Sequence, residues 1–276
     1  VGHAGFAQEA ERVSIEAHLA AHGNPKRLCV FVHGLACDES CWGERPAIVY
    51  GDALAHELGY GALYVRYDSR RSHASNGAAL CALLGRLVRV AGPRLREIVL
   101  IGHSLGAQLP GLLRHRDRLA GLLSVAAGSG YWRDNAPQLR RYVLYFWHVL
   151  VPLGTALFGY FPGKRFGKVG DLPRGVVLQW RRWCMHPRYH VGAEGDAVRE
   201  RFEAARFPVV ALSITDDELM TERGTRVLVD CYANAPRRIE RIAPHEVQAR
   251  RIGHFGFFRE QFQATLWQRC AQLLHG

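Results

Sequence analysis

The sequence predicts an α/β fold in which a mostly parallel, doubly wound sheet carries an inserted helical cap. Short apolar runs alternate with segments of helical periodicity as far as residue 127, and the alternation resumes near residue 207. The intervening residues are basic and aromatic and break this rhythm. We therefore assign residues 1–127 and 207–276 to one core and residues 128–206 to a cap.

The individual elements follow from hydrophobic periodicity and from the positions of Gly and Pro. Apolar runs predict strands at residues 28–32, 62–67, 98–101, 121–126 and 209–214, with a weaker candidate at 238–242. Helical spacing predicts helices at residues 44–58, 76–91, 105–115 and 257–274. Pro110 is expected to kink the third of these helices, and residues 1–25 are expected to pack as a helix or arm.

Composition limits the classes of partner. The chain has 276 residues, of which 48% are hydrophobic, so it can bury a large core. Its net charge is +11, and residues 131–190 alone carry +8 together with 13 of the 28 aromatic residues. Such a segment fits an anionic membrane surface, an acidic ligand, or a solvated face over an apolar lining. No zinc-finger or RNA-binding motif is present, so we expect no nucleic-acid partner.

Residues 142–161 form a run of twenty residues without a formal charge, flanked by basic pairs. The length of this run satisfies the simplest rule for a transmembrane helix. However, Pro152 and Gly154 interrupt it, and a span here would separate two halves of one sheet. We therefore expect two short lid helices over an apolar pocket, with peripheral contact to a membrane through the cap.

The seven cysteines are scattered, and no Cys-x-x-Cys pair occurs. With no N-terminal signal pattern, this usage indicates reduced thiols and a cytoplasmic location. The spacing of Cys37 and Cys41 leaves a disulfide between them open. The oligomeric state is also left open.

The apolar run at residues 98–101 leads directly into Gly-His-Ser-Leu-Gly, with Ser104 at its centre. A G-x-S-x-G sequence between a strand and a helix is typical of a strained turn that exposes a nucleophilic serine. A serine hydroxyl is a weak nucleophile near neutral pH, so it needs a histidine base and an acid that orients the histidine. Ser104 is therefore the candidate nucleophile.

His254 is the candidate base. It lies between the last predicted strand and the last predicted helix and has Gly253 and Phe255-Gly256 around it, which permits a tight approach to the sheet edge. His245, between Pro244 and Glu246, is expected to be a surface residue instead.

Three acids follow the strand predicted at residues 209–214. Asp217 is the candidate for the acid that orients His254, and Asp216 is the alternative one residue away. One member of this acidic group, which also includes Glu218, is expected to cap the following helix.

Backbone N–H groups must stabilise the negative charge that develops on the substrate oxygen. The residue after the nucleophile, Leu105, supplies one candidate donor, and Leu35 supplies the other from the loop after the first strand. His33-Gly34 is expected to shape this loop, with a role for His33 as a second base as the minor alternative.

These residues, in the order Ser104, Asp217, His254, resemble the α/β-hydrolase superfamily across residues 28–274. Residues 30–104, with VFVHGLACDESCW and LIGHS, resemble triacylglycerol-lipase-like hydrolases. Residues 128–267, with YWRDNAP, SITDDELM and IGHFGFFRE, resemble uncharacterised hydrolases related to serine aminopeptidases. The second group usually has Tyr-Asp-x-Arg-Gly-x-Gly-x-Ser before the serine strand, and the glycines of that pattern are absent from residues 67–72.

The resemblance implies a serine hydrolase that cleaves a small carboxylic ester through an acyl-enzyme. We expect neither a cofactor nor a metal ion. The apolar cap suggests a lipid-like or short acyl group, and its candidate lining is Tyr145, Phe146, Trp147, Leu150, Phe158 and Phe161. The alternatives are an acyltransferase, a serine aminopeptidase, which the basic cap disfavours, and a non-catalytic module that binds a membrane or a partner.

Overall fold

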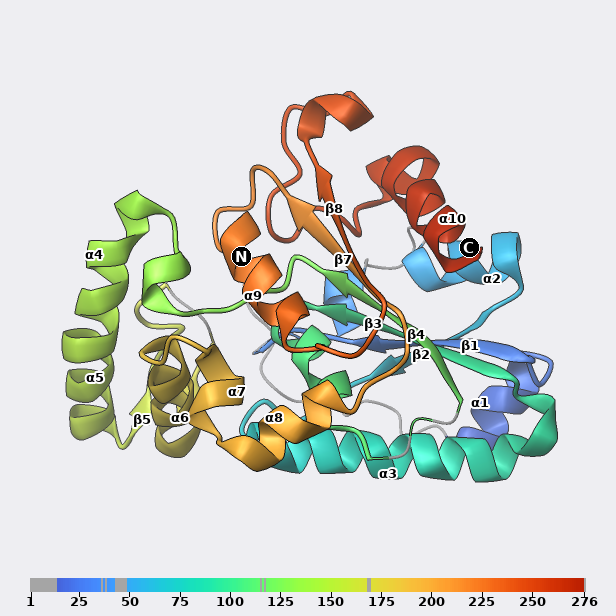
Figure 1. Cartoon of the computed structure of the whole chain (residues 1–276), viewed down its shortest axis with the longest axis horizontal. Coiled ribbons are helices and arrows are strands. Elements are labelled where there is room, and N and C mark those ends of the chain that lie inside the picture. The colour runs from blue at the N-terminus through green and yellow to red at the C-terminus, as the bar shows by residue number, and fades with distance from the viewer. Residues whose placement is uncertain are drawn as a thin grey trace.

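The structure is a computed structural model that describes residues 14–35, 37, 39–42, 49–114, 116, 118–167 and 170–275. Its centre is a six-stranded parallel sheet with strand order β2-β1-β3-β4-β7-β8 (Figure 1). The strands are β1 Arg27–Val32, β2 Gly61–Val65, β3 Glu97–His103, β4 Leu119–Val125, β7 Val209–Ile214 and β8 Arg237–Ile242. The predicted fold class is therefore confirmed.

Both faces of the sheet are buried, as is usual for parallel strands. In β1, Leu28 and Val30 point into one core cluster, while Cys29 and Phe31 point into the other. Helices α1 Ile15–Ala21, α3 His73–Ala91 and α8 Asp196–Glu203 cover the first face (Figure 1). Helices α2 Tyr50–Leu58 and α10 Gln268–His275 cover the second.

The helices were predicted less closely than the strands, and α3 begins at residue 73 rather than 76. The helix predicted at residues 44–58 is described only from residue 49 on, and of the predicted N-terminal helix or arm only α1 lies within the described residues. Residues 104–112 form a 3-10 helix rather than an α-helix, and Pro110 within it cannot donate a backbone hydrogen bond. The C-terminal helix begins at residue 260, with 3-10 and π turns before α10.

Residues 128–206, which we call the inserted segment, lie between β4 and β7 and extend to one side of the sheet (Figure 1). The helices of this segment before α8 are α4 Pro137–Tyr145, α5 Val151–Phe158, α6 Arg174–Cys184 and α7 Tyr189–Ala193. A short hairpin joins β5 Tyr160–Phe161 to β6 Leu172–Pro173. Helix α9, Glu222–Asp230, follows β7 and belongs to the core.

Helices α4 and α5 form one helical run through a π turn at Phe146–Leu150, and the expected pair of separate lid helices is wrong. Pro152 has no N–H group, and its ring would collide with the carbonyl of residue 148 in a regular helix. The π turn absorbs this defect, because the Val151 N–H donates to the carbonyl of Phe146 five residues earlier. No helix in the described part of the chain is both long and apolar enough to cross a membrane.

An aromatic cluster forms the interior of the inserted segment. It includes Phe146 and Trp147 of the helical run, Phe161 of the hairpin and Trp183 of α6, all buried. Glu194 joins α6 to the end of α7, since its carboxylate accepts hydrogen bonds from Gln179, Arg182 and Trp183. All seven cysteines lie in the described residues, and none of them is in a disulfide.

Candidate active site

The candidate residues meet at the carboxyl ends of the parallel strands. The chain goes from β1 outward to β2 and then returns to the other side of β1 as β3, so the direction of winding changes between β1 and β3. Ligands of open parallel sheets bind at such a switch point. The loop after β1 contains Leu35, and the turn after β3 contains Ser104. Val32 and Gly102 pair near the ends of these strands, which brings the two turns side by side.

Ser104 has the strained backbone that the motif predicts. Its φ angle is 51°, which few residues other than glycine adopt. The flanking glycines are required by close packing: a Cβ at Gly102 would collide with the backbone of Ala107, and a Cβ at Gly106 would collide with the carbonyl oxygen of His33. The sharp turn at Ser104 therefore requires glycine at both Gly102 and Gly106.

The loop after β1 lies against the serine turn. A Cβ at Gly34 would come within 3.3 Å of the Cβ of Ser104. The side chains of Leu35 and Leu105 are partly buried and pack against the aromatic cluster of the inserted segment. The residues predicted to donate the two N–H groups thus lie between the serine turn and the inserted segment.

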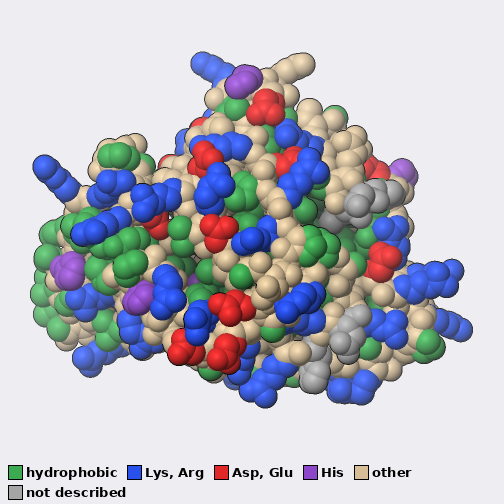
Figure 2. Space-filling view, in the orientation of Figure 1, with side chains coloured by type: hydrophobic (Ala, Val, Ile, Leu, Met, Phe, Trp, Pro, Cys, Tyr) green, Lys and Arg blue, Asp and Glu red, His purple; other side chains and the backbone are tan. Residues whose placement is uncertain are grey.

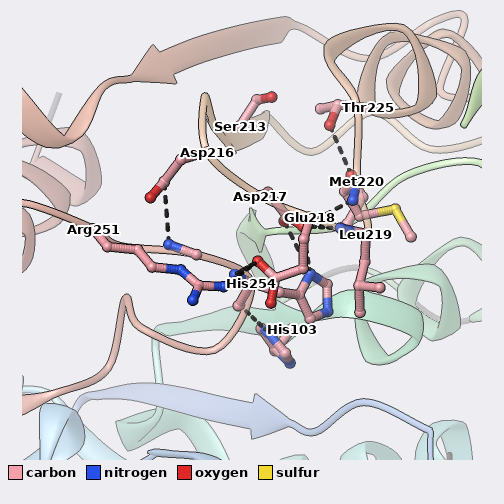
Figure 3. A network of polar contacts seen from close by, with 12 residues as sticks. His103, Ser213, Asp216, Asp217, Glu218, Leu219, Met220, Thr225, Arg251 and His254 are labelled. Atoms are coloured by element: carbon pink, nitrogen blue, oxygen red, sulfur yellow. Dashed lines mark hydrogen bonds and ion pairs between the residues drawn. The ribbon is translucent and has the colours of Figure 1, made fainter. Parts of the chain in front are cut away.

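Asp217 and His254 form the buried side-chain pair of the site. The Nδ1 atom of His254 lies 2.9 Å from Oδ2 and 3.1 Å from Oδ1 of Asp217 (Figure 3), and the Asp217 side chain has no exposed surface. Because a carboxylate only accepts hydrogen bonds, Nδ1 carries the hydrogen and the lone pair of the ring is left on Nε2. The N–H groups of Leu219 and Met220 also donate to Oδ1, each at 2.8 Å.

The two neighbouring acids hold the backbone of the histidine loop. Asp216 accepts hydrogen bonds from the N–H groups of Ile252 at 3.0 Å and Gly253 at 3.1 Å (Figure 3). Glu218 accepts one from the N–H of His254 at 3.2 Å and pairs with Arg251. Three consecutive acids therefore accept hydrogen bonds from the loop at residues 252–254, each from different donor atoms.

None of these acids caps the following helix, so that expectation is wrong. Thr221 caps α9 instead, by accepting a hydrogen bond from the N–H of Gly224 at 3.1 Å. The acids are unavailable for capping because their oxygens face the 252–254 loop. The supporting roles of Asp216 and Glu218 were missed because a sequence does not show which loop an acid faces.

His103 was also missed, although it occupies the variable position before Ser104 in the motif. Its Nε2 donates a hydrogen bond of 3.0 Å to the carbonyl of His254, which ties the serine turn to the histidine loop (Figure 3). Among the hydrogen bonds of the described residues, none joins Ser104 to the ring of His254. Such contacts often shorten only when substrate binds.

Electrostatics keep His103 neutral. Burial, together with the nearby rings of His254 and His33, lowers its pKa to about 3. His103 therefore adds no positive charge beside His254. The pKa of Glu218 is also lowered, because backbone hydrogen bonds and Arg251 outweigh the raising effect of burial.

His33 is fully buried in the loop that it was expected to shape. Its Nδ1 donates to the carbonyl of Gly34 at 2.7 Å, and its Nε2 accepts from the N–H of Tyr67 at 3.2 Å. The ring also stacks on Tyr67, with 4.2 Å between ring centroids. With both ring nitrogens in these backbone contacts, the geometry fits the loop-shaping role.

The predicted lining of the cap divides into two groups. Phe146, Trp147 and Phe161 are buried in the aromatic cluster and Leu150 packs against it, but Tyr145 and Phe158 are exposed and do not belong to it. A separate surface pocket of about 460 Å³ opens between the β2–α3 loop and α6. Its lining includes none of the candidate site residues, and the described residues contain no group of three or more side chains suited to a metal ion.

The fold and the arrangement of these loops define the class of α/β hydrolases. The chain belongs to the Alpha/beta hydrolase family, whose profile matches residues 29–265. No curated protein matches the chain.

Several solved structures share the fold. Est1E from Butyrivibrio proteoclasticus is 14% identical, with a TM-score of 0.54 and 92% of this chain and 91% of that chain covered. Est816, described as an N-acyl homoserine lactone degrading enzyme, is 16% identical, with a TM-score of 0.52 and coverage of 90% and 92%. The RedJ thioesterase from Streptomyces coelicolor is 18% identical, with a TM-score of 0.50 and coverage of 96% and 91%. The family supports a hydrolase activity, and these neighbours show the fold.

Proposed function

We propose that this protein is a serine hydrolase that cleaves carboxylic esters with an apolar acyl group. The observation that carries the proposal is the pair of His254 Nδ1 and the buried Asp217 carboxylate, 2.9 Å apart, in a loop tied through His103 to the strained Ser104 turn. Neither a binding module nor a structural protein needs this combination of strain and burial.

In the proposed reaction, the Oγ atom of Ser104 attacks the ester carbonyl while Nε2 of His254 takes the hydroxyl proton. The N–H groups of Leu35 and Leu105 donate to the oxyanion, and Asp217 stays ionised beside the charged imidazole. The bond from the carbonyl carbon to the alcohol oxygen then breaks, and His254 gives its proton to the departing alcohol. Water, deprotonated by His254, attacks the acyl-enzyme, which releases the acid and returns the proton to Ser104.

The inserted segment supports the choice of an apolar acyl group. The aromatic cluster packs against the side chains of Leu35 and Leu105, so apolar surface borders the position proposed for the scissile bond. The same segment carries a net charge of +8 at residues 131–190, which is the wrong sign to hold the ammonium group of an aminopeptidase substrate.

The test combines a covalent probe with substrate turnover. A fluorophosphonate should label the wild-type protein and the exposed-serine control Ser75→Ala, but not Ser104→Ala. Turnover of p-nitrophenyl esters should fall at least about 10⁴-fold in Ser104→Ala, because loss of the nucleophile leaves only binding and oxyanion effects. Unfolding curves of the three proteins should coincide.

Three results would count against the proposal. Equal labelling of Ser104→Ala would exclude this serine as the nucleophile, and an unlabelled wild type would favour a non-catalytic module. Faster turnover of aminoacyl anilides than of esters would favour an aminopeptidase. A flat profile across acyl lengths would remove the apolar acyl group from the proposal, and product formed only with an added alcohol would indicate acyl transfer.

A further inference from the structure

The outer face of the α4–α5 helical run is apolar and exposed, although its inner face already packs on the protein. Ten large hydrophobic side chains are exposed among the described residues, and seven of them lie in this run and the start of the hairpin: Tyr142, Tyr145, Val149, Leu153, Leu157, Phe158 and Tyr160. Figure 2 shows hydrophobic side chains gathered on the side of the molecule where α4 and α5 lie in Figure 1. We call these seven residues the outer stripe.

The spacing of the outer stripe is regular. From Tyr142 to Leu157 the exposed residues follow at intervals of three or four, so they occupy one side of successive turns. Phe158 and Tyr160 extend the stripe at the end of α5 and the start of the hairpin. The residues between them, such as Phe146, Trp147 and Val151, are buried on the opposite side. A surface helix normally has a polar outer face, and a helix that is apolar on both faces indicates a second apolar partner.

The chemistry along the outer stripe varies with position. Val149, Leu153 and Leu157 occupy the middle, and Leu157 is the most exposed of them at 68%. Tyrosines stand toward both ends, at Tyr142 and Tyr160. Tyrosine favours the boundary between hydrocarbon and water, whereas aliphatic side chains favour the hydrocarbon itself. This order suits a helix that lies flat in the surface of a bilayer.

The charges around the outer stripe indicate the sign of the charge that a binding partner should carry. Residues 137–160 contain no acid, and exposed Arg141, Lys164 and Arg165 flank the stripe. Of the two acids in residues 131–190, Asp134 is buried and paired with Arg223 at 2.8 Å. The basic side chains around the stripe therefore attract a negatively charged surface.

We propose that the outer stripe docks the protein onto the surface of an anionic phospholipid bilayer. The helix would lie in the headgroup region with Leu153 and Leu157 inserted, and Arg141 and Arg165 would contact lipid phosphates and carboxylates. A second copy of the chain would have to bring the same basic rim against itself, which charge repulsion opposes. This proposal does not depend on the proposed esterase activity.

The test measures sedimentation of the full-length protein with vesicles. We expect binding to phosphatidylcholine vesicles that contain phosphatidylserine, and much weaker binding to vesicles of phosphatidylcholine alone. Leu153→Ser/Leu157→Ser should lower the partition coefficient by about tenfold or more, since two inserted aliphatic side chains are lost. Arg141→Gln/Arg165→Gln should weaken binding and reduce its dependence on salt.

Two matched controls separate docking from folding and from catalysis. Val90→Ser makes the same kind of change at an exposed position of α3 and should bind as the wild type does. Ser104→Ala should also bind normally, so a failure of the proposed chemistry leaves this test intact. Unfolding curves will show that the leucine variant is folded.

The proposal is overturned if the wild type binds neither kind of vesicle, or if the leucine variant binds as tightly as the wild type. Equal binding to both kinds of vesicle would remove the anionic surface as the partner. A dimer in solution that disappears in Leu153→Ser/Leu157→Ser, without vesicle binding, would identify a second copy as the occupant instead.

Discussion

The sheet edge that carries the candidate site and the inserted segment beside it are held by different forces. At the sheet edge, backbone atoms set the geometry: Ser104 has a positive φ angle, Asp216 binds N–H groups of the histidine loop, and Asp217 binds N–H groups of its own turn. In the inserted segment, the interior is a cluster of packed aromatic side chains that includes Trp147 and Trp183.

Because of this difference, the two regions should respond differently to amino-acid substitution. Backbone contacts tolerate little substitution, because the groups they hold must remain within a few tenths of an ångström for the chemistry. A cluster of side chains can be repacked with limited loss as long as its volume is kept. The comparison therefore predicts that substitutions at the sheet edge have large effects on rate or stability, whereas substitutions in the inserted segment have smaller effects and act on substrate preference.

The largest expected effect tests the two adjacent acids of the sheet edge. Asp217→Asn should lower kcat for a p-nitrophenyl ester by about 10⁴-fold, because an amide no longer fixes the tautomer of His254 or stabilises its charge. Asp216→Asn keeps an oxygen for one backbone N–H and should cost within about tenfold, through a looser loop. Steady-state kinetics at one pH will separate them, and an equal or larger loss in Asp216→Asn would reverse the assignment.

The second prediction compares one glycine from each region. Gly106→Ala should destabilise the protein by several kcal/mol, about the cost of a severe core overpacking, because its Cβ would overlap the backbone after β1. Gly175→Ala lies in α6 of the inserted segment with nothing within 4 Å of the new Cβ. It should stabilise the protein by about 0.5 kcal/mol through helix propensity. Urea unfolding measures both, and a mild effect of Gly106→Ala would show that the turn can relax.

The sequence was sufficient for those parts of the molecule that depend on short-range signals. Strand β7 was predicted at its observed bounds, and the turn at Ser104 has the predicted strain, because alternating burial and a pair of glycines are local properties. The positions of the candidate site residues after successive strands of a parallel sheet predicted that His254 would meet the acids after β7 but left Asp216 open beside Asp217, and the structure places Asp217 against the ring.

The features that could not be predicted from the sequence depend on contacts between segments that are distant along the chain. His103 reaches the carbonyl of His254 across 151 positions, and Glu218 reaches its N–H across 36, so neither contact has a local signature. The continuity of α4 and α5 was hidden for another reason. Pro152 usually ends a helix, and the π turn that lets it stay depends on packing that hydrophobic periodicity does not encode.

The last prediction concerns the contact between the two regions, where His73 of α3 meets α6 and α7. The His73 ring lies 5.1 Å from Trp183 and 5.6 Å from His190, centroid to centroid. Burial lowers the pKa of His73 to about 4, although Glu194 acts in the opposite direction, and burial also lowers the pKa of His190. Both rings are therefore neutral in the folded protein at neutral pH.

Protonation should weaken this contact in acid. The unfolded chain binds a proton at His73 near its ordinary pKa of about 6.5, but the folded protein does so only near pH 4, so stability falls as pH drops through this window. His73→Phe keeps a ring beside Trp183 without a titrating group, and should remove about 2 kcal/mol of the loss between pH 7 and pH 4.5. Unfolding free energies at pH 7 and pH 4.5 measure the effect, with His56→Phe at an exposed helix position as the control. An unchanged pH dependence in His73→Phe would mean that this contact admits water before His73 is protonated, and would leave the acid sensitivity to His190 or to the buried His103 of the sheet edge.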